Sequence, residues 1–95
     1  MTELRTGYVV EAAYAEGAKQ KRAPFRDEHL ARLGKLYGEG VVAVAGALAD
    51  MSASLFILMV EGEDSARAIV ETDVYWRNGI WTDYTLRRMN CVEFD

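Results

Sequence analysis

A six-residue run at positions 55–60, Leu-Phe-Ile-Leu-Met-Val, constrains the fold of this chain more than any other feature. Six residues are too few to cross a bilayer, so the run predicts a buried strand and not a membrane segment. Successive side chains of a strand point to opposite faces of its sheet, and here both sets are apolar. The sheet that contains this strand is therefore expected to be covered on both faces.

Hydrophobic periodicity divides the chain into four strands and two helices within one domain, residues 1–95. Alternating apolar residues predict strands, whereas apolar residues three or four positions apart predict helices. The expected strands span residues 7–14, 41–48, 55–60 and 80–94, and the expected helices span residues 24–38 and 64–72. Residues 15–21 are polar and predict a loop, and residues 73–79 predict a short helical or turned connector.

Local signals mark where the two helices begin. Pro24 suits the first turn of the first helix, and the acidic Asp27 and Glu28 suit the positive end of its dipole. Asp64 is the expected N-cap of the second helix.

The order strand-helix-strand-strand-helix-strand predicts an α+β ferredoxin-like fold, with a four-stranded antiparallel sheet and both helices on one face. No further segment is left to cover the other face of the sheet. A second copy of the chain is the expected cover, which gives a homodimer packed sheet against sheet. The alternative is a monomer with a small exposed apolar patch.

The composition excludes several classes of function. The net charge is −4 and the Lys and Arg residues are scattered, so we expect no nucleic-acid partner. A single cysteine, Cys91, and a single histidine, His29, exclude an intrachain disulfide and cysteine-rich or multi-histidine metal sites. The glycines form no phosphate-binding motif, so we expect no metal and no cofactor. The first residues do not resemble a signal peptide, which predicts a cytoplasmic protein without a membrane partner.

The predicted topology gathers several polar and aromatic residues at one end of the sheet. The first helix begins there, the hairpin turns there, and the connector enters the last strand there. The residues are His29 with Arg26, Asp27, Asp50, Asp73, Tyr75, Trp76 and Arg77. A histidine with a carboxylate partner is the minimal equipment for proton transfer near neutral pH, and Arg26 suits an anionic substrate group.

Several of these residues also have a purely structural interpretation. A histidine in the first turn of a helix is often solvated, and Asp73 can simply cap the connector. Asp50 is an ordinary turn residue, and the two tryptophans suit the core or a dimer contact. Tyr8, Tyr14 and Tyr84 are expected to be sheet residues.

The order of short motifs resembles the YCII-related (YciI-like) family. The motifs are Arg-Asp-Glu-His-Leu at 26–30, Gly-Ala-Leu at 46–48, and Asp-Val-Tyr at 73–75 followed by Gly79. Where the family has prolines, this chain has Asp27, Ala47 and Val74. The resemblance implies a dimeric α+β barrel and an active site built on His29 and Asp73. A related dehydrochlorinase of chlorinated hydroxyquinol breakdown implies lyase-type chemistry.

We therefore expect a small homodimeric enzyme with metal-independent acid–base chemistry of the lyase, isomerase or hydrolase type. Its substrate would be a small organic molecule, aromatic or anionic. His29 would move the proton and Asp73 would orient the imidazole. The expected substrate-binding residues are Arg26, Tyr75, Trp76 and Asp50. The alternative is a non-catalytic dimeric module that binds a small ligand or assists a larger enzyme.

Overall fold

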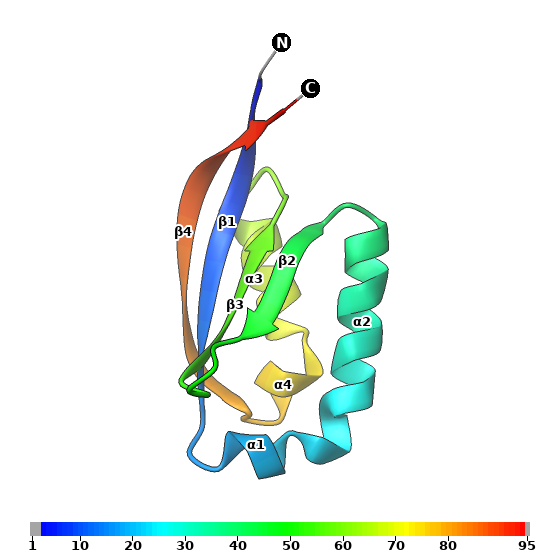
Figure 1. Ribbon diagram of the computed structural model, residues 1–95, viewed down its shortest axis with the longest axis vertical. Coiled ribbons are helices and arrows are strands. Elements are labelled where there is room, and N and C mark those ends of the chain that lie inside the picture. Colours follow the sequence, from blue (N-terminus) through cyan, green and yellow to red (C-terminus); the bar gives the residue numbers. More distant parts are fainter. Residues whose placement is uncertain (1–2, 95) are drawn as a thin grey trace.

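The computed structural model describes residues 3–94, and its four strands form one antiparallel sheet in the order β2-β3-β1-β4. Helices lie against one face of this sheet (Figure 1). The elements are β1 (Glu3–Tyr14), α1 (Ala18–Lys21), the 3-10 helix η1 (Ala23–Phe25), α2 (Arg26–Gly38), β2 (Val42–Ala47), β3 (Ala53–Leu58), α3 (Glu63–Glu71), α4 (Val74–Arg77) and β4 (Trp81–Glu93). This arrangement confirms the expected ferredoxin-like fold.

Several expected boundaries were wrong. The segment predicted as a loop contains the short helix α1, which follows Gly17 in the left-handed conformation (φ 71°) and buries Ala18. Strand β1 begins at Glu3 and not at residue 7, because its first residues pair with the end of β4. Strand β3 begins two residues earlier than predicted, where Ala53 pairs with Ala13.

The start of α3 also differs from the prediction. Its N-cap is Gly62, and Asp64 lies within the first turn beside Glu63. Two carboxylates in the first turn still favour this helix, because they face the positive end of its dipole. The acidic turn was interpreted correctly as a helix start, but the cap lies two residues earlier.

The core lies between the sheet and the helices. The sheet contributes Val10, Ala12 and Leu58 to it, and α3 contributes Ala66 and Val70, all of them fully buried. In α2, whose residues are all described, His29 is the one buried side chain, while its leucines stay partly exposed. The packing between α2 and the sheet is thus loose enough to leave space beside His29.

An irregularity in the sheet decides where Trp81 points. Ala13 pairs with Asp83 and Tyr14 pairs with Trp81, so Thr82 is an extra residue in β4. An extra residue reverses the alternation of side chains beyond it. Trp81 therefore joins the core, at 2% exposure, on the same face as the even-numbered Tyr84. Strict alternation would have placed it on the opposite face.

Candidate active site

His29 is held at the base of the space between α2 and the sheet. Its Nδ1 atom lies 2.9 Å from one carboxylate oxygen of Asp73 and 3.1 Å from the other. His29 is 6% exposed and Asp73 is 1% exposed, so the contact is shielded from bulk water. An ionised carboxylate has no proton to donate, so Nδ1 carries the hydrogen of this bond.

Asp73 uses both of its oxygens. Oδ1 accepts the backbone N–H of Tyr75 at 2.9 Å, which caps α4, and Oδ2 accepts Nη1 of Arg32 at 3.1 Å. A buried carboxylate is stable only when it is paired and hydrogen-bonded, and these contacts meet that requirement. Asp73 is therefore both the helix cap and the partner of His29.

Arg32 was not identified from the sequence, although it lies next to the predicted pair. Besides Asp73 it contacts Thr72, whose Oγ1 accepts Nη2 at 2.7 Å. Its signal was available, because Arg32 follows His29 by three positions and therefore lies on the same face of α2. Arg32 brings positive charge to the carboxylate, at the oxygen Oδ2 that also lies 3.1 Å from Nδ1 of His29.

Two aromatic rings fix the imidazole plane. Tyr75 stacks on His29 with 3.8 Å between ring centroids and 12° between planes. Trp81 meets the same ring edge-on at 5.4 Å and 86°. With Nδ1 bonded to Asp73 and the ring held on two sides, the position of Nε2 is determined.

A small open cavity of about 90 Å³ lies beside His29. Its wall is mostly apolar, and four of its side chains carry a polar group. The lining residues are Tyr14, His29, Leu30, Leu33, Ala45, Gly46, Ala47, Ser54, Phe56 and Trp81. Among residues 3–94, every side-chain nitrogen or oxygen that is buried from solvent has a hydrogen-bond partner. Nε2 of His29 has no hydrogen-bond partner among these residues, so it is not one of the buried atoms. Nε2 is therefore accessible, and its lone pair can accept a proton from a molecule in the cavity.

A row of hydrogen bonds along the cavity wall was not predicted from the sequence. Nε1 of Trp81 donates to Oγ of Ser54 at 3.1 Å, and Oγ of Ser54 donates to the Tyr14 hydroxyl at 2.7 Å. Nη1 of Arg22 donates to the same hydroxyl at 3.3 Å. Tyr14 and Trp81 were predicted to be sheet or core residues, and no local motif distinguishes them as site residues.

Of the expected substrate-binding residues, Tyr75 comes next to His29, and burial raises the pKa of its phenol. Arg26 is exposed at the start of α2 and is not part of the cavity wall. Trp76 packs edge-on against Tyr84 at 5.1 Å instead. Asp50 accepts the backbone N–H of Ser52 in the exposed hairpin turn, a bond that lowers its pKa.

None of the four expected substrate-binding residues lines this cavity. Asp50 and Trp76 lie outside the cavity because each is engaged by its own neighbours in the fold. The pair His29 and Asp73 and the ring of Tyr75 form one connected group.

No helix among the described residues is long and apolar enough to cross a membrane. The same residues contain no cluster of three or more His, Cys, Asp or Glu side chains arranged to hold a metal ion.

Comparison with known proteins identifies the family. The structure is similar to that of 5-chloro-2-hydroxyhydroquinone dehydrochlorinase (TftG) from Burkholderia phenoliruptrix AC1100, solved in complex with 2,5-dihydroxybenzoquinone. The two share 23% sequence identity with a TM-score of 0.76, over 87% of this chain and 92% of the other. No curated protein matches the chain. The model of the YCII-related domain matches residues 6–90, and the chain therefore belongs to the YCII-related domain family.

Proposed function

We propose that this protein is an acid–base enzyme in which His29 transfers a proton to or from a small organic molecule. The observation that carries this proposal is the bond between Nδ1 and a buried carboxylate, which leaves Nε2 accessible beside the cavity. A base held in this way is typical of general acid–base catalysis.

In the proposed reaction, Nε2 takes a proton from the substrate and the imidazole becomes positively charged. Asp73 stabilises that charge through Nδ1–H, and Arg32 keeps the carboxylate in place. In an elimination, the electron pair of the broken C–H bond forms a double bond and the leaving group departs with its own bonding pair. An isomerisation would return the proton at another atom, and a hydrolysis would use it to activate water.

Elimination is the class that the comparison favours. The similar structure belongs to a dehydrochlorinase, a protein that removes hydrogen chloride from a hydroxylated ring. The cavity here suits a molecule of that size only in part. A closed cavity of about 150 Å³ holds benzene, whereas this one measures about 90 Å³ and is open. A ring would therefore lie only partly inside the cavity.

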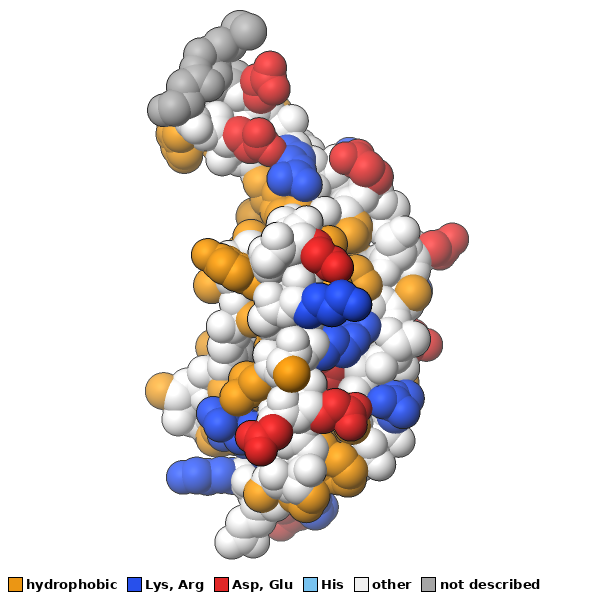
Figure 2. All heavy atoms as spheres, turned by 90° about the vertical axis from the view of Figure 1, so that its right-hand side faces the viewer, with side chains coloured by type: hydrophobic (Ala, Val, Ile, Leu, Met, Phe, Trp, Pro, Cys, Tyr) orange, Lys and Arg blue, Asp and Glu red, His pale blue; other side chains and the backbone are white. Residues whose placement is uncertain are grey.

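We also propose that the protein is a homodimer packed through the outer face of its sheet, the face away from the helices. Leu55 and Ile57 of β3 are half-buried on this face, as is Met59 just after the strand, and Val44 of β2 is 53% exposed. Figure 2, with α2 toward the viewer, shows charged side chains over the middle and hydrophobic ones along the left edge. The accessible surface of 5966 Å² also exceeds the roughly 5,500 Å² expected for a monomer of this mass.

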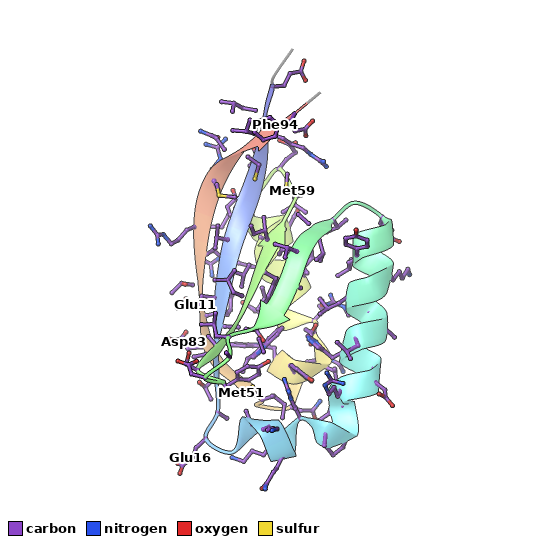
Figure 3. All side chains as sticks on the ribbon, in the orientation of Figure 1. Glu11, Glu16, Met51, Met59, Asp83 and Phe94 are labelled. Carbon is purple, nitrogen blue, oxygen red and sulfur yellow. The ribbon has the colours of Figure 1, made fainter. Side chains whose placement is uncertain are left out.

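A wide groove supports the same assembly. It lies where Met59 and Phe94 are found in Figure 3, at the end of the sheet opposite Met51 and the hairpin turn. Its apolar wall includes Ile57, Met59 and Met89, so it continues the outer face. A second copy of the chain would cover both surfaces together.

The test of the catalytic proposal uses purified protein with 5-chloro-2-hydroxyhydroquinone and its chlorine-free analogue. Chloride release is measured with the first compound, and exchange of ring hydrogen for solvent deuterium is followed by NMR with both. Exchange reports proton transfer even where no group leaves. His29→Asn should lower either rate about 10²- to 10⁴-fold. Arg77→Gln, on the exposed side of α4, should change neither.

The result separates an enzyme from a binding module. A protein that binds these compounds without halide release or exchange would be a small-ligand module, and the catalytic proposal would be wrong. Equal rates in the wild type and His29→Asn would also contradict it, because the proton would then be moved by another group.

A further inference from the structure

We propose that the hydroxyl of Tyr14 donates a hydrogen bond to an oxygen of the bound molecule, opposite His29. The site would then select molecules whose oxygen is anionic or becomes so, such as phenolates and enolates. This inference rests on the proposed function, because it assigns the substrate class to the same cavity. Tyr14 and His29 both line that cavity, from the end of β1 and from α2.

The hydrogen-bond directions leave the Tyr14 proton unused by the protein. The indole N–H of Trp81 can only donate, so Oγ of Ser54 is its acceptor. Oγ of Ser54 has two lone pairs and one proton, and in the structure that proton is donated to the Tyr14 oxygen at 2.7 Å. The guanidinium of Arg22 can also only donate, and it approaches the same oxygen at 3.3 Å. The Tyr14 oxygen thus accepts two bonds.

A phenolic oxygen that accepts twice still has a proton to donate. Within residues 3–94 no acceptor receives that proton in a hydrogen bond. Tyr14 lines the cavity, so a ligand oxygen there can accept it. The row of donors from Trp81 through Ser54 also holds the hydroxyl in place, because Ser54 is 5% exposed and Trp81 2% exposed.

The charge beside Tyr14 indicates which oxygen suits this position. The guanidinium carbon of Arg22 lies 5.8 Å from the centre of the Tyr14 ring, in addition to its bond to the hydroxyl. A hydroxyl donor next to a fixed positive charge stabilises an oxygen that carries negative charge. Neither His29 nor Asp73 supplies this, because Nε2 is the base and the carboxylate is bonded elsewhere.

The two groups then divide one proton-transfer step between them. Nε2 of His29 forms a bond to a proton as the C–H or O–H bond of the substrate breaks. The electron pair left behind moves onto the substrate oxygen, directly or through a conjugated double bond. The Tyr14 hydroxyl and the charge of Arg22 face that oxygen. Proton and charge both balance, and no further reactant is needed for this step.

Two probes of almost equal shape test the assignment. 4-Nitrophenol, ionised at mildly alkaline pH, offers an anionic oxygen, and 4-nitrotoluene replaces that oxygen by a methyl group. Affinities are measured by calorimetry with the wild-type protein. We expect about tenfold or greater preference for the nitrophenolate, as a hydrogen bond to a charged group provides.

Tyr14→Phe keeps the ring and removes the hydroxyl. It should lower the affinity for nitrophenolate about tenfold and leave the affinity for nitrotoluene within about twofold of the wild type. Most of the preference would then be lost. The nitrotoluene measurement also reports whether the variant is folded with an intact cavity. Tyr37→Phe is the matched control, because Tyr37 is 66% exposed and does not line this cavity, and it should change neither affinity.

A second variant protects the test against misfolding. Arg22→Met removes the charge beside the Tyr14 hydroxyl from a partly exposed position, and it should reduce the preference in the same direction. If both variants keep the wild-type preference, or if the wild type binds neither probe at millimolar concentration, the assignment of Tyr14 is wrong.

The assignment of Tyr14 and the catalytic proposal can fail independently of each other. Loss of preference in Tyr14→Phe, in a protein that shows no deuterium exchange, would support Tyr14 and contradict proton transfer by His29. Exchange that depends on His29, in a protein whose preference ignores Tyr14, would contradict only the Tyr14 assignment.

Discussion

Nδ1 of His29 and the carboxylate of Asp73 meet at 2.9 Å and 3.1 Å, although 44 positions separate the two residues in the chain. Their contact depends on the fold, because the start of α2 and the turn between α3 and α4 lie at the same end of the sheet (Figure 1). The turn that brings Asp73 there is stabilised by the same carboxylate, which caps α4. Structure and proposed chemistry thus depend on one side chain.

Replacing Arg32 by Met should destabilise the protein by about 1–2 kcal/mol. The change removes a charge-assisted bond to the buried Asp73 and a bond to Thr72, and partial exposure of Arg32 reduces the effect. Urea unfolding at neutral pH measures it. Arg77→Met is the control, because its ion pair with Glu28 and its bond to the Thr72 carbonyl are both exposed, and it should change stability by less than about 0.5 kcal/mol. Equal losses in both variants would show that Arg32 does not support Asp73.

Stability should fall steeply above about pH 10, partly because of Tyr75. Burial raises the pKa of Tyr75, so its phenol stays protonated in the folded state after the unfolded chain has begun to ionise. Its contribution is complete below pH 10 and is lost as the pH rises toward the folded pKa. Tyr75→Phe should therefore flatten the alkaline part of the curve of unfolding free energy against pH.

Tyr84 adds to this slope, because its pKa is also raised, chiefly by burial. The double variant Tyr75→Phe with Tyr84→Phe should be flatter than either single one. An unchanged slope in Tyr75→Phe would mean that its phenol is not desolvated in solution.

Light scattering at micromolar concentration should give twice the chain mass. Ile57→Glu places a charge in the apolar outer face and should yield the single mass, since a buried unpaired charge is expensive. Ala68→Glu makes the matched change on the exposed side of α3 and should remain dimeric. A wild-type protein of single mass would leave the apolar outer face without the proposed cover.

Deleting Thr82 should change stability by less than about 1 kcal/mol, because Thr82 is the extra residue of β4. Trp81 would keep its pairing with Tyr14 and its place in the core. Deleting Thr85, which pairs regularly with Glu11, should instead turn the first residues of β4 to the wrong face. Exposing Trp81 alone would then cost about 1.5–3 kcal/mol. Thermal unfolding and tryptophan fluorescence distinguish the two deletion variants. Similar losses of stability in both would contradict the pairing of β1 with β4 described above.

The element order was predictable because alternation and helical spacing are local properties of the sequence. The placement of Trp81 was not, since one unpaired residue in β4 reverses the alternation and nothing in the local sequence marks it. Helix α1 was missed because polar residues beside a glycine predict a loop, whereas the buried Ala18 and backbone bonds favour a helical turn.

Part of the candidate site was predictable from the sequence. The contact between His29 and Asp73 was predictable because topology and family resemblance both point to these two residues. Tyr14 and Ser54 were not found, because their role depends on bonds between strands and on the direction of each donor. Asp50 belongs to the same end of the sheet, but topology does not specify that its carboxylate turns back to Ser52.

The protonation pattern of the His29 ring tests the central claim most directly. Nitrogen NMR of the neutral imidazole shows which ring nitrogen carries the hydrogen, and His29 is the single histidine of the sequence. The bond to Asp73 predicts hydrogen on Nδ1 and a lone pair on Nε2. Asp73→Asn replaces one acceptor oxygen by a donor and should shift the population toward hydrogen on Nε2. A wild-type ring with its hydrogen on Nε2 would contradict the account, because the atom beside the cavity would then have no lone pair to accept a proton.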